Sequence, residues 1–373
     1  MKILLMGDAS NYHRALAFGL SALGHDVTVA SDGTRWLGTE RDIDLSRSLP
    51  GPAGGALLYL RLCTVLASDL RGYDVVHLCS PGFVHLKPQR IRNIFDRLKR
   101  DNGAVILTAL GTDSYYVSRV TSDNPPLRYS EWAVGTKPTP FAVAAEQGRR
   151  EWLADELKDH TRYIYENTDG CVTALYEYHR ILEEVYPHDR LAYIGIPIDT
   201  AGVKTLAMPP DGLVRIMVAY HPGRMVEKGI DILLPGLRRL EASSGGRIVV
   251  DEVSGIPYAD FVRRLRECHI IADQAYSYTP ATTALLTMAT GRVTVSGAEP
   301  EYYDFIDEHE LRPIINVKPD DISSTMDQIR EIALDTDRLM DMSRQGPLFV
   351  RRHNDSLVVA RRLEDFYRRL ELM

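Results

Sequence analysis

The stretch HPGRMVEKG, residues 221–229, follows an apolar run over residues 214–220 and precedes a segment whose apolar residues recur at helical spacing from Ile230 onward. This pattern predicts a strand, a loop and a helix, with Arg224 and Lys228 in the loop. Two cations beside the free backbone N–H groups of a helix start are a common way to bind a phosphate or diphosphate. The alternative is a pair of solvated loop charges, which is frequent on protein surfaces.

Short apolar segments alternate with helix-period segments on both sides of this stretch. The strands that we predict lie at residues 3–6, 27–30, 75–78, 104–108, 170–174, 216–219, 247–250, 270–272, 293–296 and 313–317. Residues 195–213 are rich in Gly and Pro and predict a linker. The pattern predicts an α/β protein made of two Rossmann-like domains with parallel sheets, whose ligands bind at the carboxyl ends of the strands.

The predicted boundaries follow from these elements. We expect an N-terminal Rossmann-like domain over residues 1–195, a linker over 196–213, a second Rossmann-like domain over 214–355 and a C-terminal helix over 356–373.

Composition excludes several classes of protein. The net charge of −7 over 373 residues argues against general nucleic-acid binding. The four cysteines form no Cys-x-x-Cys pair, which argues against a disulfide framework or a zinc site and favours a reducing compartment. No apolar run reaches about 20 residues, so we expect a cytoplasmic protein. Scattered Arg pairs are read as solvated faces, with peripheral contact at the inner face of a membrane as the alternative.

A first candidate site follows the opening strand. Its residues are Gly7, Asp8, Ser10, Asn11 and Tyr12. The loop lacks the Gly-x-Gly-x-x-Gly spacing of dinucleotide-binding proteins. Gly7 allows a ligand to approach the backbone closely. The alternative reading is that Asp8 and Ser10 only cap the following helix.

A second candidate site precedes a predicted helix in the second half. Its residues are Ser277, Tyr278, Thr279, Thr282 and Thr283. Thr279 suits the N-cap and Pro280 the first helical position, and the positive end of the helix dipole favours an anion. The alternative is an ordinary capped helix that binds nothing.

Taken together, Gly223-Arg224, Lys228-Gly229 and residues 288–295 resemble motifs of GT-B-fold glycosyltransferases, in particular of glycosyltransferase family 4. The resemblance covers nearly the whole chain. It implies that Arg224 and Lys228 neutralise the diphosphate of a sugar nucleotide and that Thr279, Thr282 and Thr283 assist. It also implies that Ser277 and Tyr278 lie near the nucleotide or sugar, and that the last helix returns to the first domain. A bound metal or separate cofactor is not expected, because the nucleotide sugar is itself the substrate.

Three positions depart from the family pattern. Tyr278 and Leu286 stand where the family carries glutamates, and Leu110 stands where it carries a histidine. His77, at the end of a predicted strand, and Asp113 are the substitutes that we predict as catalytic residues. A histidine at a strand end is also often a structural hydrogen-bonding group.

The sequence therefore predicts a retaining, metal-independent glycosyltransferase. Its donor would be a UDP- or GDP-sugar. Its acceptor would be a glycan, either free or lipid-linked, as in the assembly of a surface polysaccharide. Two alternatives stay open: a non-catalytic nucleotide-sugar-binding or partner subunit, and a sugar-nucleotide epimerase. For the variant that lacks both Arg224 and Lys228, we expect lost diphosphate affinity with a nearly unchanged melting temperature.

Overall fold

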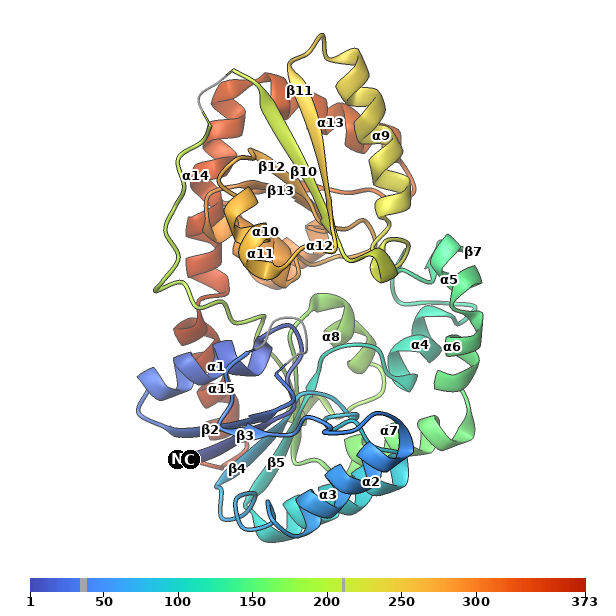
Figure 1. The fold of residues 1–373 in the computed structure, drawn as a ribbon, viewed down its shortest axis with the longest axis vertical. Helices are drawn as coiled ribbons and strands as arrows, with labels where there is room; N and C mark the ends of the chain where they lie inside the picture. The colour runs from blue at the N-terminus through green and yellow to red at the C-terminus, as the bar shows by residue number, and fades with distance from the viewer. Residues whose placement is uncertain (34–38, 210–211) are drawn as a thin grey trace. The chain divides into compact units, whose positions relative to one another are not determined.

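The computed structural model describes residues 1–33, 39–209 and 212–373, and the chain divides into two compact units (Figure 1). Residues 210–211 of the predicted linker lie outside the described residues. Unit 1 contains Met1–Arg119, Gln147–Asp199 and Asp355–Met373, and unit 2 contains Val120–Glu146 and Thr200–Asn354.

Unit 1 is built on a parallel sheet. Its strands, among the described residues, are β3 (Ile43–Asp44), β2 (Asp26–Ser31), β1 (Lys2–Met6), β4 (Val75–Leu78), β5 (Ala104–Ala109), β8 (Gly170–Thr173) and β9 (Leu191–Tyr193), in this spatial order. Each neighbouring pair is parallel. The order reverses between β1 and β4, and such a switch point is where ligands bind in open α/β sheets.

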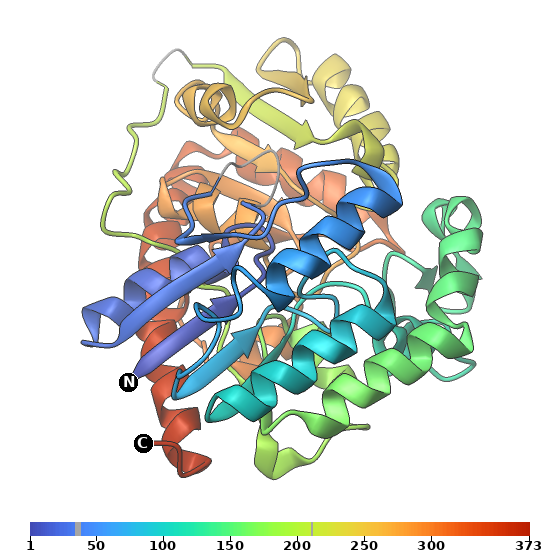
Figure 2. The ribbon, with the colours of Figure 1, turned by 60° about the horizontal axis from the view of Figure 1, so that its bottom comes forward.

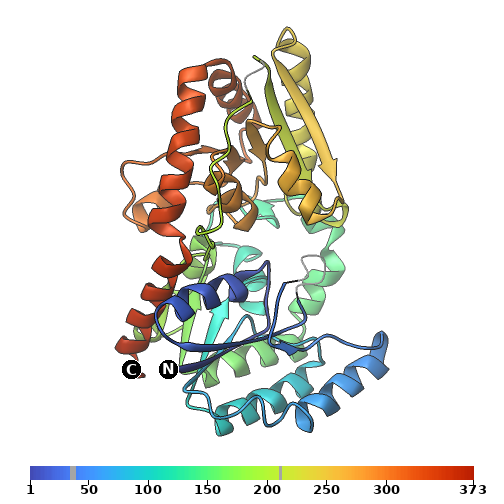
Figure 3. The same ribbon diagram turned by 60° about the vertical axis from the view of Figure 1, so that its left-hand side comes forward.

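Helices cover both faces of this sheet. One face packs against α2 (Gly51–Cys63), α3 (Pro88–Asp101) and α7 (Asp155–Asn167), which Figure 2 shows in front of the strands. The other face carries α1 (Tyr12–Ala22) and α15 (Ser356–Arg369), which pack against each other (Figure 3). The remaining helices are α4 (Ser114–Val120), α6 (Glu146–Trp152), α8 (Tyr176–Leu182) and the 3-10 turn His188–Arg190. The terminal helix thus belongs to unit 1.

Unit 2 repeats the design with fewer strands. The order of its parallel strands is β11 (Ile248–Ser254), β10 (Val214–Tyr220), β12 (Ile270–Ala272), β13 (Val293–Ser296) and β14 (Ile314–Asn316). Helices α9 (Ile230–Ser243) and α13 (Ile322–Leu334) pack on one face. Helices α10 (Tyr258–Arg264), α11 (Thr282–Ala289) and α14 (Thr336–His353) lie on the other, and α12 (Pro300–Phe305) follows β13. The switch point of this sheet lies between β10 and β12.

The first half of the chain contributes one segment to unit 2. We call Val120–Glu146 the strap; it contains a two-strand hairpin of β6 (Ala133–Val134) and β7 (Lys137–Pro138), followed by α5 (Pro140–Ala144). The sequence predicts a continuous N-terminal domain over residues 1–195, whereas the structure assigns Val120–Glu146 to unit 2. The physical reason is that the strap's polar and aromatic groups bond to unit 2, as described below.

Candidate functional site

The loop after β1 lies at the switch point of unit 1. Gly7 has a φ of 78°, and a Cβ at this position would collide with the Cys79 sulfur and the Phe83 carbonyl, so only glycine fits. Ser10 and Asn11 follow with φ values of 54° and 66°. Two consecutive left-handed residues other than glycine store backbone strain, which clusters at functional sites.

Asp8 is the titratable group of this loop. Its Oδ1 accepts a hydrogen bond from the His13 N–H at 2.9 Å, so Asp8 does cap α1. Its Oδ2 is buried and accepts no hydrogen bond within the described residues. Burial, with a smaller contribution from the nearby Asp32 carboxylate, raises the pKa of Asp8 to about 6, against the lowering effect of backbone hydrogen bonds such as that from His13. A carboxyl whose pKa lies near neutrality changes its protonation state under ordinary reaction conditions, which is typical of a group that accepts a proton in catalysis.

Tyr12, the last predicted residue of the loop, points into the protein. It is 1% exposed, and burial raises the pKa of its hydroxyl. The exposed part of the predicted loop is therefore Asp8 to Asn11.

His77 and Asp113, predicted as catalytic, have their polar atoms engaged inside unit 1. His77 is fully buried, and its ring nitrogens bond to the hydroxyls of Thr108 at 2.7 Å and Tyr367 at 3.3 Å. Asp113 accepts hydrogen bonds from the Tyr116 N–H and the Tyr165 hydroxyl, both at 2.8 Å. Burial lowers the pKa of His77 and raises that of Asp113. These contacts favour the structural alternative for His77, and they favour a structural role for Asp113 as well.

In unit 2, Lys228 lies where the loop after β10 meets the loop after β12. Its Nζ donates to Asp273 Oδ1 at 2.6 Å, and its carbonyl accepts from the Ala275 N–H at 2.8 Å. Asp273 follows β12 directly and is fully buried, whereas the Lys228 side chain keeps 14% exposure. The predicted cation is thus fixed at the switch point of the sheet with a carboxylate partner.

Arg224 lies one turn earlier in the same loop. Its guanidinium makes a two-point ion pair with Glu227, with distances of 2.6 and 3.0 Å. The Arg224 side chain is 54% exposed, so the pair is solvated and weak.

The helix start at the second predicted site differs in detail from the expectation. Helix α11 begins at Thr282 with Ala281 as its N-cap, and not at Pro280 with Thr279 as the cap. Thr279 lies in a bend before the helix, and Pro280 and Ala281 separate it from the first helical residue. Ser277 and Thr279 are buried, while Thr282 and Thr283 are partly exposed in the first turn. The two exposed hydroxyls are therefore those of the first turn.

Tyr278 is taken up by the strap. Its hydroxyl accepts a hydrogen bond from the Arg128 N–H at 2.7 Å, and its ring stacks on Tyr129 with centroids 4.6 Å apart. Glu299 is buried nearby and accepts from the Tyr129 hydroxyl and the Asn316 side chain, both at 2.8 Å. These contacts and the burial of Tyr278 favour a role in holding the strap.

Arg128 completes the cluster. Its guanidinium forms ion pairs with both Glu299 and Glu301. The strap thus docks on the loops after β12 and β13, at the carboxyl ends of the strands, where ligands of such sheets bind.

Replacing Arg128 with alanine is expected to loosen the strap. The buried Glu299 would lose its cation, and because Arg128 is itself more than half exposed we expect a modest cost of about 1–2 kcal/mol. Hydrogen exchange should show faster labelling of residues 120–146. Arg263→Ala, which removes an exposed surface ion pair of unit 2, is the matched control. Unchanged protection of the strap in Arg128→Ala would contradict its docking role.

The sequence reading missed Asp273, Glu299 and the strap. Asp273 had a usable signal, because an acidic residue directly after a buried strand lies at the ligand-binding edge of a parallel sheet. Among the residues that the structure describes, no group of three or more metal-ligating side chains comes together.

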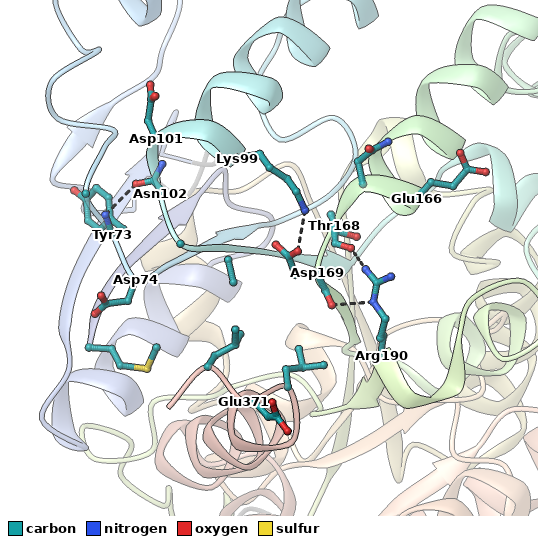
Figure 4. Close-up of a pocket in the computed structure, with 17 residues that line it drawn as sticks. Tyr73, Asp74, Lys99, Asp101, Asn102, Glu166, Thr168, Asp169, Arg190 and Glu371 are labelled. Atoms are coloured by element: carbon teal, nitrogen blue, oxygen red, sulfur yellow. Dashed lines mark hydrogen bonds and ion pairs between the residues drawn. The ribbon is translucent and has the colours of Figure 1, made fainter.

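A recess of about 1190 Å³ lies at the amino ends of the strands of unit 1 (Figure 4). Its cations are used internally: Lys99 pairs with Asp169 at 2.8 Å, and Arg190 donates to the carbonyls of Thr168 and Asp169. Ligands of parallel sheets bind at the opposite ends, so this recess is not our candidate site.

Among the described residues, no helix is both long enough and apolar enough to cross a lipid bilayer.

Neither a protein-family model nor a curated protein sequence matches the chain. Solved structures do. Sucrose-phosphate synthase from Thermosynechococcus elongatus is 15% identical with a TM-score of 0.63 and coverage of 100% of this chain and 99% of that one. Anabaena HepE in complex with UDP and glucose is 10% identical, with a TM-score of 0.59 and 98% coverage of both chains.

A candidate UDP-N-acetylglucosamine 2-epimerase from Listeria monocytogenes is also similar, at 10% identity and a TM-score of 0.55, with coverage of 100% of this chain and 97% of that one. Each match extends over essentially the whole of both chains, so both units take part in the likeness. At such low identity the likeness establishes the fold alone. With its two Rossmann-like parallel-sheet units, this chain is a GT-B-fold protein.

Proposed function

We propose that the chain is a glycosyltransferase that moves a sugar from a nucleoside diphosphate to a hydroxyl of a glycan. The donor is of the UDP or GDP type, the configuration at the anomeric carbon is retained, and no metal or separate cofactor is required. The acceptor belongs to a surface polysaccharide or its lipid-linked precursor. Solved structures of similar fold that contain UDP and glucose, or UDP-glucose, support the class of reaction.

One observation carries the proposal. Lys228, after β10, lies at the switch point of unit 2 beside the loop that leads to the first turn of α11, with Thr282 and Thr283. A fixed ammonium group and the N–H groups of a helix start are the donors that stabilise a departing diphosphate. Arg224, on the same loop, adds a second cation for the outer phosphate.

The acceptor side of the proposal uses the loop after β1. Asp8 and the strained residues Ser10 and Asn11 follow the strand at the switch point of unit 1. The Asp8 carboxylate would hold the attacking hydroxyl and take up its proton. His77 and Asp113 would support the surrounding core instead of contacting substrate.

The test is a panel of UDP-, GDP- and ADP-sugars, with slow donor hydrolysis followed by NMR in the absence of acceptor. A glycosyltransferase releases the nucleoside diphosphate and free sugar in the α or β form that reports retention. An epimerase converts the sugar of the intact donor without release. A non-catalytic subunit binds a donor and leaves it intact. If no nucleotide sugar is bound or changed, the proposal is wrong.

Asp8→Asn is expected to lower activity and raise stability together. Because the folded-state pKa of about 6 lies above the unfolded value of 3.8, the stability that Asp8 contributes at low pH is lost as pH rises through 6. Asparagine keeps the cap on His13 without the buried charge. We expect a gain of up to about 3 kcal/mol at pH 8 and a fall of about 100-fold in kcat/KM.

Two measurements check this variant. Thermal unfolding at pH 4 and pH 8 should show the gain at pH 8 alone. The activity of the wild type should fall as pH drops through about 6, where Asp8 becomes protonated. Full activity of Asp8→Asn would remove Asp8 from the reaction.

A further inference from the structure

Both cations of the proposed diphosphate site already have a carboxylate partner. Lys228 Nζ lies 2.6 Å from Asp273, and the Arg224 guanidinium lies 2.6 Å from Glu227. With ordinary protonation the four side chains carry no net charge. This differs from a simple pair of cations, which would bind any diphosphate through uncompensated attraction.

The Lys228–Asp273 pair is held in place by the surrounding backbone. The Ala275 N–H donates to the Lys228 carbonyl at 2.8 Å, and the Asp273 N–H donates to the Val295 carbonyl at 3.0 Å. Gly229 has a φ of 68°, and a Cβ there would press on Ala275. The backbone on both sides of the ion pair is therefore fixed by hydrogen bonds and close packing.

Asp273 still has one unused oxygen. Its Oδ2 is fully buried and makes no hydrogen bond within the described residues. A buried carboxylate next to a bound phosphate is poorly screened by solvent, so it repels the phosphate more strongly than a surface charge would. Glu227, which is partly exposed, repels it less.

The charge of the ligand changes during the proposed reaction. Once the sugar has left, the diphosphate gains a terminal phosphate whose second ionisation lies near pH 6, so the product carries about one more negative charge than the donor. A site with two uncompensated cations would hold this product more tightly than the donor, and release would become slow.

We propose that Asp273, assisted by Glu227, balances the charge of the diphosphate site so that the nucleoside diphosphate product is bound weakly enough to leave. This inference rests on the proposed function. Asp273 also orients Lys228, so it is a positioning residue whose charge sets the affinity of the site for diphosphates.

The test compares binding of UDP and of inorganic diphosphate by calorimetry at pH 8. Asp273→Asn keeps an oxygen for the Lys228 ammonium and removes the negative charge, and we expect about 10-fold tighter UDP binding. Glu227→Gln should tighten it about threefold, because its charge is more exposed. Asp251→Asn, which removes the partner of Arg264 on the outside of unit 2, is the matched control and should change nothing.

Kinetics give a second readout. In Asp273→Asn, kcat should fall while inhibition by added UDP becomes stronger, because product release limits turnover. A purely orienting role would instead raise KM and weaken UDP binding. Unchanged or weaker UDP binding in folded Asp273→Asn, or in Glu227→Gln should Asp273→Asn not fold, overturns the inference.

The outcomes also separate this inference from the proposed function. Lys228→Met should abolish UDP binding both in the otherwise wild-type chain and in the chain that also carries Asp273→Asn. If the wild type and Lys228→Met bind UDP equally, the proposed donor site is wrong. If Lys228→Met loses UDP binding but neither Asp273→Asn nor Glu227→Gln binds UDP more tightly, the donor site stands and the charge-balancing role is wrong.

Discussion

Lys228→Ala is expected to lower kcat/KM for the nucleotide-sugar donor by about two to three orders of magnitude. The reason is that the ammonium group is fixed by Asp273 and by the backbone before the substrate arrives. An ammonium group that is already in place beside the leaving group needs no rearrangement during the reaction. Its removal therefore mainly raises the free energy of the transition state. Steady-state kinetics with saturating acceptor measure the effect.

This variant is also expected to lose stability, which revises the expectation from the sequence that removing Arg224 and Lys228 leaves the melting temperature nearly unchanged. Removal of Lys228 strands the buried Asp273 carboxylate, at a cost of about 3 kcal/mol. Lys228→Met combined with Asp273→Asn removes both charges and should recover most of the stability without recovering activity. Recovered activity in the double variant would show that Lys228 serves only to neutralise Asp273.

Arg292→Met is expected to give the largest loss of stability, about 3–5 kcal/mol. Arg292 directly precedes β13 and is fully buried, and its guanidinium donates to the carbonyls of Leu265, Leu206 and Ala207 at 2.7, 3.1 and 2.9 Å. Methionine fills similar space but leaves the buried guanidinium donors unreplaced, so the buried Leu265 carbonyl and the part-buried carbonyls of Leu206 and Ala207 lose their donor. Burial lowers the pKa of Arg292, whose guanidinium is held by backbone carbonyls among the described residues.

Chemical denaturation measures this loss, with Arg266→Met as the control on an exposed side chain of the same unit. Faster hydrogen exchange should appear in residues 205–209, which the guanidinium anchors. A loss below about 1 kcal/mol, within the range of ordinary surface changes, would contradict the anchoring role.

The framework of both sheets was predictable because buried parallel strands are continuous apolar runs. The predicted strands at 270–272 and 293–296 coincide with β12 and β13, and that at 75–78 with β4. The loop that carries Lys228 was predictable for a related reason, since its cations lie between such a strand and a periodic helix. Local sequence therefore located this loop between β10 and α9.

The carboxylate partners of Lys228 and of Arg128 were not predictable in the same way. Asp273 lies 45 residues from Lys228 along the chain, and Arg128 lies 171 residues from Glu299. Contacts of this range leave no periodic pattern. The strap has only short strands and no amphipathic helix of useful length, so its attachment to unit 2 depends on individual polar bonds that sequence spacing does not reveal.

The strap also limits which segments of this chain can be combined with segments of another protein of the same fold. Unit 2 is assembled from two separate pieces of chain, and the piece from residues 120–146 supplies Arg128 and Tyr129 to Glu299 and Tyr278. A chimaera that joins a foreign first half to residues 200–354 would therefore leave a buried glutamate without its cation. Recombination at the linker should succeed only when residues 120–146 are transplanted together with residues 200–354.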